Sequence, residues 1–403
     1  MDRYKSFFRG IAYAGYCIVF LFAVYTFEKS IPDQIYVKAG EAIDYQFQVP
    51  VTMEIQEDSS PVAKSTNNAN VRQSYIVTCR LFGIFPVKDI EVVLVDGDAV
   101  YAGGMPIGIY VKTSGVLVIG TSEVERPDGS ESAPAENILK AGDYILSVNG
   151  EKVAEKEDLQ RLVQQNGAEK EILKINRKGE EVEVGVTPVQ NKNGTYMLGA
   201  WVRDDLAGIG TLTYYKEDGT YGALGHAVSD GDVGERIQMS EGYVYNAQII
   251  GVKKGQKGNP GELSGMIRYQ SADCLGTIEE NTDIGIYGKL DGNIAALPRG
   301  DYYNICYKQD IKQGPATIIC GFTGEKKEYA IEIESLDYSG REANKGILFR
   351  VTDEQLLDMT GGIVQGMSGS PILQDGKIIG AVTHVFVSDS SMGYGIFIEN
   401  MVE

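Results

Sequence analysis

The sequence predicts a mainly β protein of several domains that follow an apolar N-terminal segment. Its 403 residues are too many for one small domain, so two or three domains are expected. From Leu198 onward, short glycine-punctuated runs such as "GIGTLTYYKEDGTYGALGHAV" succeed one another with almost no helical pattern. Such spacing is typical of a β-barrel or sandwich. Near the other end of the chain, residues 10–27 carry no charge.

That apolar run predicts a cytoplasmic tail and a signal anchor within residues 1–30. The run "GIAYAGYCIVFLFAVYTF" has 18 residues, the short end of the range for a membrane-spanning helix. Arg3, Lys5 and Arg9 precede it, which favours a cytoplasmic N-terminus and an exported remainder. A cleaved signal peptide is the alternative, but no small-x-small cleavage site follows the run.

Residues 31–99 form a second, β-rich segment. The runs "QIYVKAGEAIDYQFQVPVTMEI" and "SYIVTCRLFGIFPVKDIEVVLV" are rich in β-branched and aromatic residues, as strands are. Residues 56–70 between them are rich in Ser, Asn and other small or polar residues. This composition predicts a flexible linker, and such linkers are preferred sites of proteolytic cleavage.

The composition excludes several classes of function. The net charge of −19 argues against nucleic acid as the main partner, because phosphate binding needs basic patches. The five cysteines include no CxxC pair, and the chain has only two histidines. A disulfide framework and a zinc site built on histidines are therefore not expected, and a single disulfide bridge stays an alternative.

Residues 100–190 resemble a bacterial PDZ domain. A helix-like "AENILKAG" is followed by a strand and by an Asn-Gly turn at Asn149. A second helix comes next, with Leu159, Leu162 and Val163 at helical spacing. The stretch "LKAGDYILSVNGEKV" is the most specific part of the match. The resemblance implies that a peptide strand adds to the edge of the sheet.

The same resemblance places the loop that binds the peptide carboxylate in "GGMPIG". Backbone N–H groups of such a loop hold the carboxylate. The residues expected to do so are Gly104, Met105, Pro106 and Ile107. An ordinary turn between two strands is the alternative for these glycines.

The motif "GMSGSP", residues 366–371, is the strongest catalytic signal. A serine is a poor nucleophile unless a base takes its proton and N–H donors stabilise the oxyanion. This turn could present Ser368 while the N–H groups of Gly366 and Ser368 converge on one point, as in an oxyanion hole. Ser370 is the alternative nucleophile, although its place directly before Pro371 favours a structural role.

Two histidines compete as the general base. His226, in "GALGHAVSD", lies in a turn at the end of a β run. His384, in "GAVTHVFVS", lies within the strand that follows the serine turn and is expected to line the cleft or the core. Base and nucleophile should come from turns that can converge, so His226 is the predicted base.

Two aspartates compete as the third member, which orients the imidazole. Asp283, in "NTDIGIYGKL", begins a strand between base and nucleophile and resembles the aspartate segment of chymotrypsin-like and HtrA-like proteases. Asp353, in "RVTDEQLL", shortly precedes the serine turn. Spacing alone leaves both open.

Taken together, "TGGIVQGMSGSPILQDGKIIGAVTHVFV", "LGHAVSD", the PDZ-like unit and the apolar N-terminus resemble the stage IV sporulation protein B (SpoIVB) peptidase family over essentially the whole chain. The resemblance implies a chymotrypsin-like double β-barrel over residues 195–403 and a serine endopeptidase that needs no cofactor. The family's catalytic positions fall on Ser368, His226 and Asp353. In chymotrypsin-like barrels the aspartate belongs to the first barrel, as Asp283 would, so the third member stays open.

The resemblance also implies a biological role. In that family the enzyme is exported from the forespore into the space between the two forespore membranes, and it cleaves itself near its N-terminus under control of the PDZ unit. It cuts a regulatory membrane protein that restrains an intramembrane metalloprotease, which releases processing of a late sigma factor. One alternative is an HtrA-like quality-control protease, although those chains place the PDZ unit after the protease. The other is a catalytically inactive PDZ-bearing scaffold.

Overall fold

A computed structural model of the chain describes residues 31–38, 51–55, 62–64, 72–95, 99–291 and 301–402, with four isolated positions before residue 30. Apart from those positions, the predicted tail and signal anchor lie outside the described residues. In the described part of the chain, none of the helices has the length and apolar character needed to cross a membrane.

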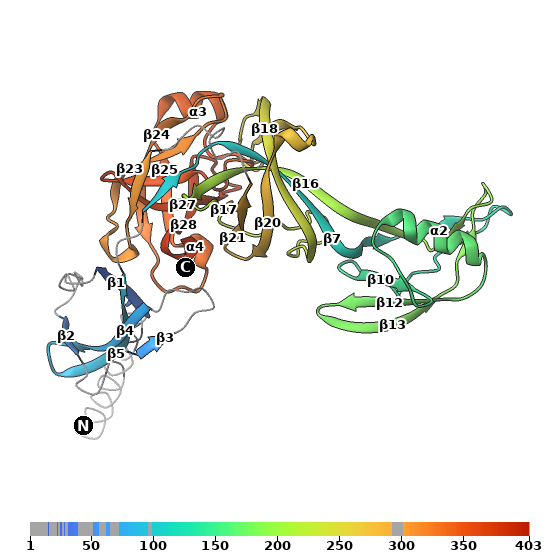
Figure 1. The fold of residues 1–403 in the computed structure, drawn as a ribbon, viewed down its shortest axis with the longest axis horizontal. Helices are drawn as coiled ribbons and strands as arrows, with labels where there is room; N and C mark the ends of the chain where they lie inside the picture. The colour runs from blue at the N-terminus through green and yellow to red at the C-terminus, as the bar shows by residue number, and fades with distance from the viewer. Residues whose placement is uncertain are drawn as a thin grey trace, which may run out of the picture.

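A small sheet at one end of the molecule is built from the β-rich N-terminal segment (Figure 1). Its strands are β1 (Gln34–Lys38), β2 (Val51–Ile55), β3 (Val62–Lys64), β4 (Arg72–Leu81) and β5 (Phe85–Val95), in the order β1-β5-β4-β2 with β3 also paired to β4. The β-branched residues Val77, Ile90 and Val92 are fully buried and form its core. Strand β3 lies inside the predicted linker 56–70, whose other residues are outside the described part.

A closed barrel forms the centre of the molecule. Its first strands are β6 (Ala99–Ala102) and part of β7 (Pro106–Thr121). The later strands are β16 (Ala200–Tyr215), β17 (Thr220–Ala223), β18 (Met239–Lys253), β19 (Glu262–Ile267), β20 (Cys274–Thr282), β21 (Gly285–Leu290), β22 (Tyr302–Ile305), β23 (Gly314–Cys320), β24 (Lys327–Leu336), β25 (Ile347–Val351), β26 (Pro371–Gln374), β27 (Lys377–Val385) and β28 (Met392–Phe397). Two short helices accompany them, α3 (Glu354–Thr360) and α4 (Glu399–Val402).

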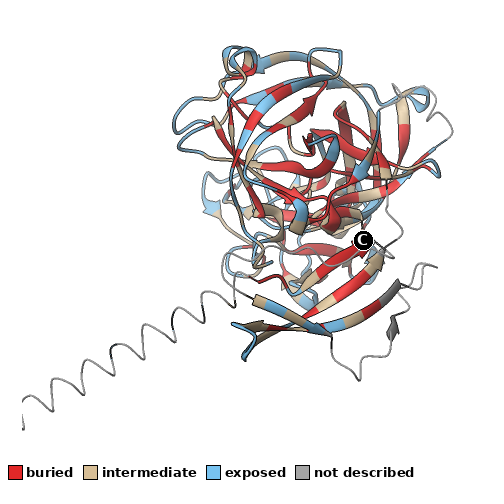
Figure 2. Ribbon diagram, turned by 90° about the vertical axis from the view of Figure 1, so that its left-hand side faces the viewer, coloured by how far each residue is buried: buried red, intermediate tan, exposed pale blue. Residues whose placement is uncertain are grey.

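Three hydrophobic cores are found among the described barrel residues: the first among β7 and β16–β21, the second among β23–β28, and the third where β6, β22 and β26–β28 meet the small sheet. Strand β24 shows why its sequence forms a barrel wall: Tyr329, Ile331 and Ile333 are buried, and the residues between them are exposed. This alternation is the pattern of a strand with one wet face. Figure 2 shows the buried residues concentrated in the barrel strands. The predicted mainly β fold is confirmed at this level.

The PDZ unit is the only part of the described chain that combines a longer helix with a sheet. Helix α2 (Lys156–Asn166) buries Leu159, Leu162 and Val163, as their helical spacing predicted. The strands of the unit are β8 (Val124–Glu125), β9 (Glu131–Ser132), β10 (Tyr144–Val148), β11 (Glu151–Lys152), β12 (Glu171–Arg177), β13 (Glu180–Val186), β14 (Val189–Gln190) and β15 (Tyr196–Met197).

The PDZ unit is inserted into the barrel and does not simply precede it. Strands β7 and β16 have 16 residues each and pair antiparallel over most of their length, forming the ribbon that joins the two units in Figure 1. Residues 107–113 pair with barrel strand β18, whereas residues 116–117 pair with β10. Residues 100–112 therefore belong to the barrel, although the predicted boundary at residue 100 assigned them to the PDZ unit. A strand pattern shows that a segment is extended, not which partner it takes.

The loop predicted to bind a peptide carboxylate also lies in the barrel, which corrects the assignment of Gly104, Met105, Pro106 and Ile107. The N–H of Gly104 donates to a β16 carbonyl at 2.7 Å, and its own carbonyl accepts from the N–H of residue 321 at 2.7 Å. A Cβ on Gly104 would lie 2.5 Å from Ile319. Ile107 is buried in the first core. These glycines allow neighbouring strands to pack closely. A loop that binds a carboxylate also needs glycines for close backbone approach, so the two cases look alike in the sequence.

Candidate active site

Ser368 lies in a tight turn between α3 and β26. Gly366 and Gly369 flank it, and both have a φ of +96°, a conformation that glycine adopts readily. A Cβ on Gly369 would lie 2.1 Å from the Thr211 carbonyl oxygen and 2.6 Å from the Leu224 nitrogen. Glycine is therefore required for the serine turn to press against strands of the first core.

The backbone of the turn leaves two N–H groups free. The Gln365 carbonyl accepts a hydrogen bond from β19 at 2.9 Å, and the Met367 carbonyl accepts one from Ser370 at 3.0 Å. The C=O and N–H of one planar peptide group point in opposite directions, so these bonds fix where the N–H groups of Gly366 and Ser368 point. Within the described part of the chain, neither N–H has an acceptor. The pair can hold an oxyanion.

Thr211 of β16 holds the same turn from the other side. Its N–H donates to the Ser368 carbonyl at 3.0 Å, and its hydroxyl donates to the Gly366 carbonyl at 2.8 Å. The side chain of Thr211 is buried. Strand β16, which runs from the PDZ unit into the barrel, thus contacts the serine turn through Thr211.

His226 follows β17 and lies against β27. A Cβ on the preceding Gly225 would lie 2.8 Å from Thr383, so the two segments are in close contact. The Nδ1 atom of His226 is 2.8 Å from the Ala227 carbonyl oxygen. A carbonyl only accepts, so Nδ1 carries the proton and Nε2 keeps a free lone pair. Burial lowers the pKa of His226, which favours the neutral form that a base needs.

His384 packs beside that imidazole, with the two ring centroids 5.3 Å apart. Burial, reinforced by the neighbouring His226, lowers the pKa of His384 to about 4. Its Nδ1 is buried and has no hydrogen-bond partner among the described residues. His384 is therefore a neutral neighbour of the predicted base at physiological pH.

The two serines of the turn differ in access. The Ser368 hydroxyl is partly exposed and donates to the Thr383 carbonyl at 2.8 Å, next to His384. Ser370 is fully buried, and its oxygen lies 3.4 Å from the Cys320 sulfur. Only Ser368 is placed to meet a substrate.

The two predicted aspartates have other partners. Asp353 caps α3, accepting from the Leu356 N–H at 2.9 Å and from the Ala330 N–H at 3.4 Å. Asp283 is 83% exposed and forms an ion pair of 3.3 Å with Arg236. Among the residues that the structure describes, no carboxylate is hydrogen-bonded to either imidazole. In the described structure the Ser368 hydroxyl bonds the Thr383 carbonyl and neither imidazole, and His226 packs on His384, the next residue of β27. The predicted nucleophile and base thus lie on adjacent segments, and neither aspartate is brought to them.

We expect Asp353→Asn to leave self-cleavage within about fivefold of wild type, because Asn caps a helix about as well as Asp. The rate of self-cleavage, with circular dichroism as a check of the fold, measures this. A third triad member would behave differently, since an amide in its place costs about 10⁴-fold in kcat. Asp283→Asn is the matched variant. A loss of that size in one of the two would show that its carboxylate reaches His226 in the active state.

A groove of about 480 Å³ borders the serine turn. It lies between residues 207–209 of β16, residues 262–267 of β19 and residues 365–366. The groove reaches Gly366, whose N–H is one of the two free donors. It is suited to the part of a substrate chain that adjoins the scissile bond.

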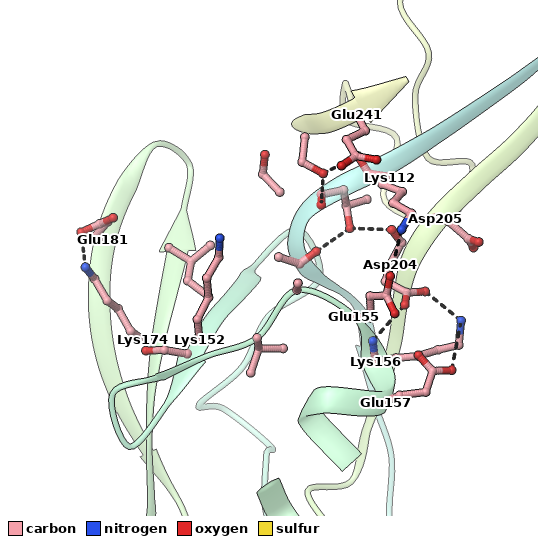
Figure 3. Close-up of a pocket in the computed structure, with 18 of the residues that line it drawn as sticks. Lys112, Lys152, Glu155, Lys156, Glu157, Lys174, Glu181, Asp204, Asp205 and Glu241 are labelled. Carbon is pink, nitrogen blue, oxygen red and sulfur yellow. Dashed lines mark hydrogen bonds and ion pairs between the residues drawn. The ribbon is translucent and has the colours of Figure 1, made fainter. Parts of the chain in front are cut away.

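A larger cavity, of about 1330 Å³, lies at the junction of the PDZ unit and the barrel (Figure 3). Ion pairs line it, with N–O distances of 2.8 Å both for Lys112 with Glu155 and for Lys156 with Asp204. Burial alone would raise the pKa of Asp204, but hydrogen bonds from Lys156 outweigh it and leave the pKa lowered. These pairs tie the start of α2 to the ribbon. None of the residues that line this cavity belongs to the serine turn or to the segment of His226.

Several supporting groups carried no sequence signal. The side chain of Asn281 bonds both the N–H and the carbonyl of Val228, at 2.8 and 2.9 Å, and so holds the turn of His226. The β20–β21 hairpin, which carries Asp283, thus contributes the side-chain amide of Asn281 to the turn of His226 and does not contribute a carboxylate. The roles of Thr211 and of the Ala227 carbonyl could not be predicted either, because a sequence does not show which hydrogen bonds these groups form. In the described residues no three His, Cys, Asp or Glu side chains are grouped to hold a metal ion.

Comparison with known families agrees with this architecture. A family model described as SpoIVB peptidase S55 matches residues 194–402, more than half of the chain. A PDZ domain model matches residues 128–177, within the inserted unit. No curated protein matches the sequence. The chain belongs to the SpoIVB peptidase S55 family.

Proposed function

We propose that this peptidase is a serine endopeptidase with Ser368 as nucleophile and His226 as general base. The observation that supports it is that the half-buried Ser368, in a turn with two free N–H groups, donates to the Thr383 carbonyl next to His384, whose ring lies against the imidazole of His226. The chemistry requires these three parts together. Family membership supports the same reaction class.

The mechanism follows from these atoms. The Ser368 hydroxyl leaves the Thr383 carbonyl, gives its proton to Nε2 of His226, and its oxygen attacks the scissile carbonyl. The N–H groups of Gly366 and Ser368 hold the resulting oxyanion. The protonated His226 then gives its proton to the leaving amine. Water, activated by the same imidazole, releases the acyl group and restores the serine.

The Ala227 carbonyl takes the orienting role in this proposal. In a triad the third member holds the imidazole by accepting from Nδ1–H. Here the accepting atom at 2.8 Å is a backbone oxygen. A carbonyl fixes the same tautomer but, being uncharged, stabilises an imidazolium less than a carboxylate does.

The biological role proposed is the one that the family implies. The enzyme is exported from the forespore through an N-terminal anchor and acts between the two forespore membranes during sporulation. It cuts a regulatory membrane protein and thereby triggers intramembrane processing of a late sigma factor. Self-cleavage is placed within residues 56–70. An N-terminus of the mature enzyme outside that stretch, read by mass spectrometry, would refute this placement.

We propose that the PDZ unit takes its peptide on the open edge of β16. Residues 200–203 pair with β7 on one side, and the registers of the described strands give them no partner on the other side. Helix α2 adjoins that side, where Gln164 bonds the backbone of Tyr196 just before the strand. Gly199, with a φ of +67°, precedes the strand as a carboxylate loop requires.

Peptide display tests this edge. Ala200 is half-buried and packs on the PDZ core, so Ala200→Arg would fill the space beside α2. We expect it to weaken binding of selected C-terminal peptides to the full chain at least about tenfold, because strand addition needs a free edge. Met105→Ala, in the loop first predicted to bind the carboxylate, is the matched control and should bind as wild type does. The reverse pattern would place the site at residue 105.

A fluorophosphonate probe tests the proposed chemistry. An activated serine forms an O–P bond with it and releases fluoride, whereas an ordinary serine does not react. We expect one adduct per chain, located on Ser368 by peptide mass spectrometry, and the same adduct in Ser370→Ala. Absence of any adduct in the folded protein would favour the scaffold alternative. General digestion of unfolded casein would favour the quality-control alternative.

A further inference from the structure

We propose that the turn between β4 and β5 inserts into the lipid bilayer that holds the N-terminal apolar run. Residues 82–86 read "FGIFP" and carry no charge. The side chains of Phe82, Ile84 and Phe85 are 64%, 67% and 61% exposed. Three large apolar side chains thus project together from one hairpin end.

The core of the sheet does not require large apolar side chains at these exposed positions. Phe82 has a φ of +53°, in the left-handed region that bulky residues avoid and that Asn, Asp and Gly usually occupy in hairpins. Exposure of the aromatic and aliphatic groups to water is a second cost at the same place. Burial in an apolar medium outside the protein would offset both.

The register of the sheet points this turn toward the membrane side. Strand β1 runs parallel to β5, with Gln34 opposite Glu91. The chain before β1 therefore runs toward the start of β5, and Ile31 reaches Lys88, whose Nζ donates to the Ile31 carbonyl at 2.6 Å. Ile31 and the β4–β5 turn thus share one end of the sheet.

The lengths of the connecting segments allow one bilayer to hold the apolar run and also contact the β4–β5 turn. The apolar run ends at Phe27, and the four residues to Ile31 span at most about 14 Å. Phe85 lies three strand residues beyond Lys88, a distance of roughly 10 Å in the same direction. A bilayer that holds the run is therefore within reach of the turn.

The charges near the turn are paired and set back from it. Arg80 pairs with Glu54, and Lys88 pairs with Asp33, each at 2.7 Å. No net charge accompanies the apolar tip, and the whole chain carries −19. Attraction to anionic lipid is not the driving force here. The interaction should be hydrophobic, insensitive to salt, and complete on a neutral lipid.

This inference rests on the proposed anchor and goes beyond it. An anchor alone tethers the chain through a few residues and leaves its orientation free. A second contact at the β4–β5 turn would fix the sheet against the membrane and orient the barrel, which packs on the sheet through Tyr36 and Val93.

Tryptophan quenching tests the contact. The full chain, with Ser368→Ala to prevent loss of the anchor, is reconstituted in phosphatidylcholine vesicles with and without brominated acyl chains. Its one tryptophan, Trp201, lies near the start of β16 and pairs with β7 in the PDZ unit, and it is replaced by Phe in the test variants. Figure 1 shows the PDZ unit and the β4–β5 sheet at opposite ends of the molecule. Phe85→Trp reports the turn. Ile76→Trp, at an exposed position on β4 away from the turn, is the matched control.

We expect a blue-shifted emission and a roughly twofold loss of intensity on brominated lipid for Phe85→Trp, unchanged in high salt, because the indole enters the acyl region. Ile76→Trp should show neither effect, and the same holds for the parent Ser368→Ala chain that retains Trp201. If the chain floats with the vesicles but Phe85→Trp emits as in water without quenching, the turn does not insert and the anchor stands. If the chain does not float, the anchor fails and this inference fails with it.

Discussion

Ser368→Ala is expected to abolish self-cleavage, with a rate on the order of 10⁴-fold or more below wild type, because no other group in the turn can form the acyl-enzyme. The reaction is followed as the appearance of the new N-terminus in the purified full chain. Circular dichroism should be unchanged, since the Ser368 hydroxyl makes a single hydrogen bond, to the Thr383 carbonyl.

Ser370→Ala is the matched control for this prediction. It removes a hydroxyl two residues away that is fully buried beside Cys320. We expect cleavage to stay within about threefold of wild type, with a small loss of stability from one buried contact. Cleavage that survives Ser368→Ala but is lost in Ser370→Ala would exchange the roles of the two serines. Survival in both would refute the serine mechanism.

His226→Ala should lower the cleavage rate by a similar factor, on the order of 10⁴-fold, because the serine then has no base. His384→Ala should cost less than about tenfold, since this ring only packs beside the base. The two histidines are thus separated by single substitutions in the same full chain. A large loss in His384→Ala, with His226→Ala near wild type, would make His384 the base.

The pH dependence of cleavage follows from the same residue. A general base must be neutral, so the rate should fall as the pH drops through the pKa of His226. Burial lowers that pKa, so the midpoint should lie below 6.5 and the rate should be close to its maximum at pH 7. His384, with a pKa of about 4, stays neutral through this range. A midpoint above 6.5 would show that a negative charge supports His226, which would return a carboxylate to the site.

Much of the fold could be predicted because it depends on local patterns. The 2-residue alternation of β24 and the helical spacing of Leu159, Leu162 and Val163 are properties of short stretches, and the structure reproduces both. The boundary of the PDZ unit could not be placed in this way. Strand β7 is continuous through it, and only its pairing partners change from the barrel to the PDZ sheet.

The glycine loop at Gly104 illustrates the same limit. Its sequence suits a carboxylate loop, but the strand after it continues into the barrel, so the glycines serve close packing against Ile319. The edge of β16 that the structure leaves open lies about a hundred residues further along the chain. A loop's chemistry is readable from its residues, whereas its neighbours depend on the course of the strands that it joins.

By itself the sequence determined the class of the protein: a β-rich peptidase of the SpoIVB family with a PDZ unit, and a serine turn whose glycines permit a tightly bent backbone. It also limited the base to two histidines. Only the tertiary structure decided that His226 and His384 lie side by side and that Thr211 holds the serine turn. These two contacts join residues far apart in the chain, and long-range pairing is set by how the whole barrel closes, whereas the cap that Asp353 makes on α3 is local.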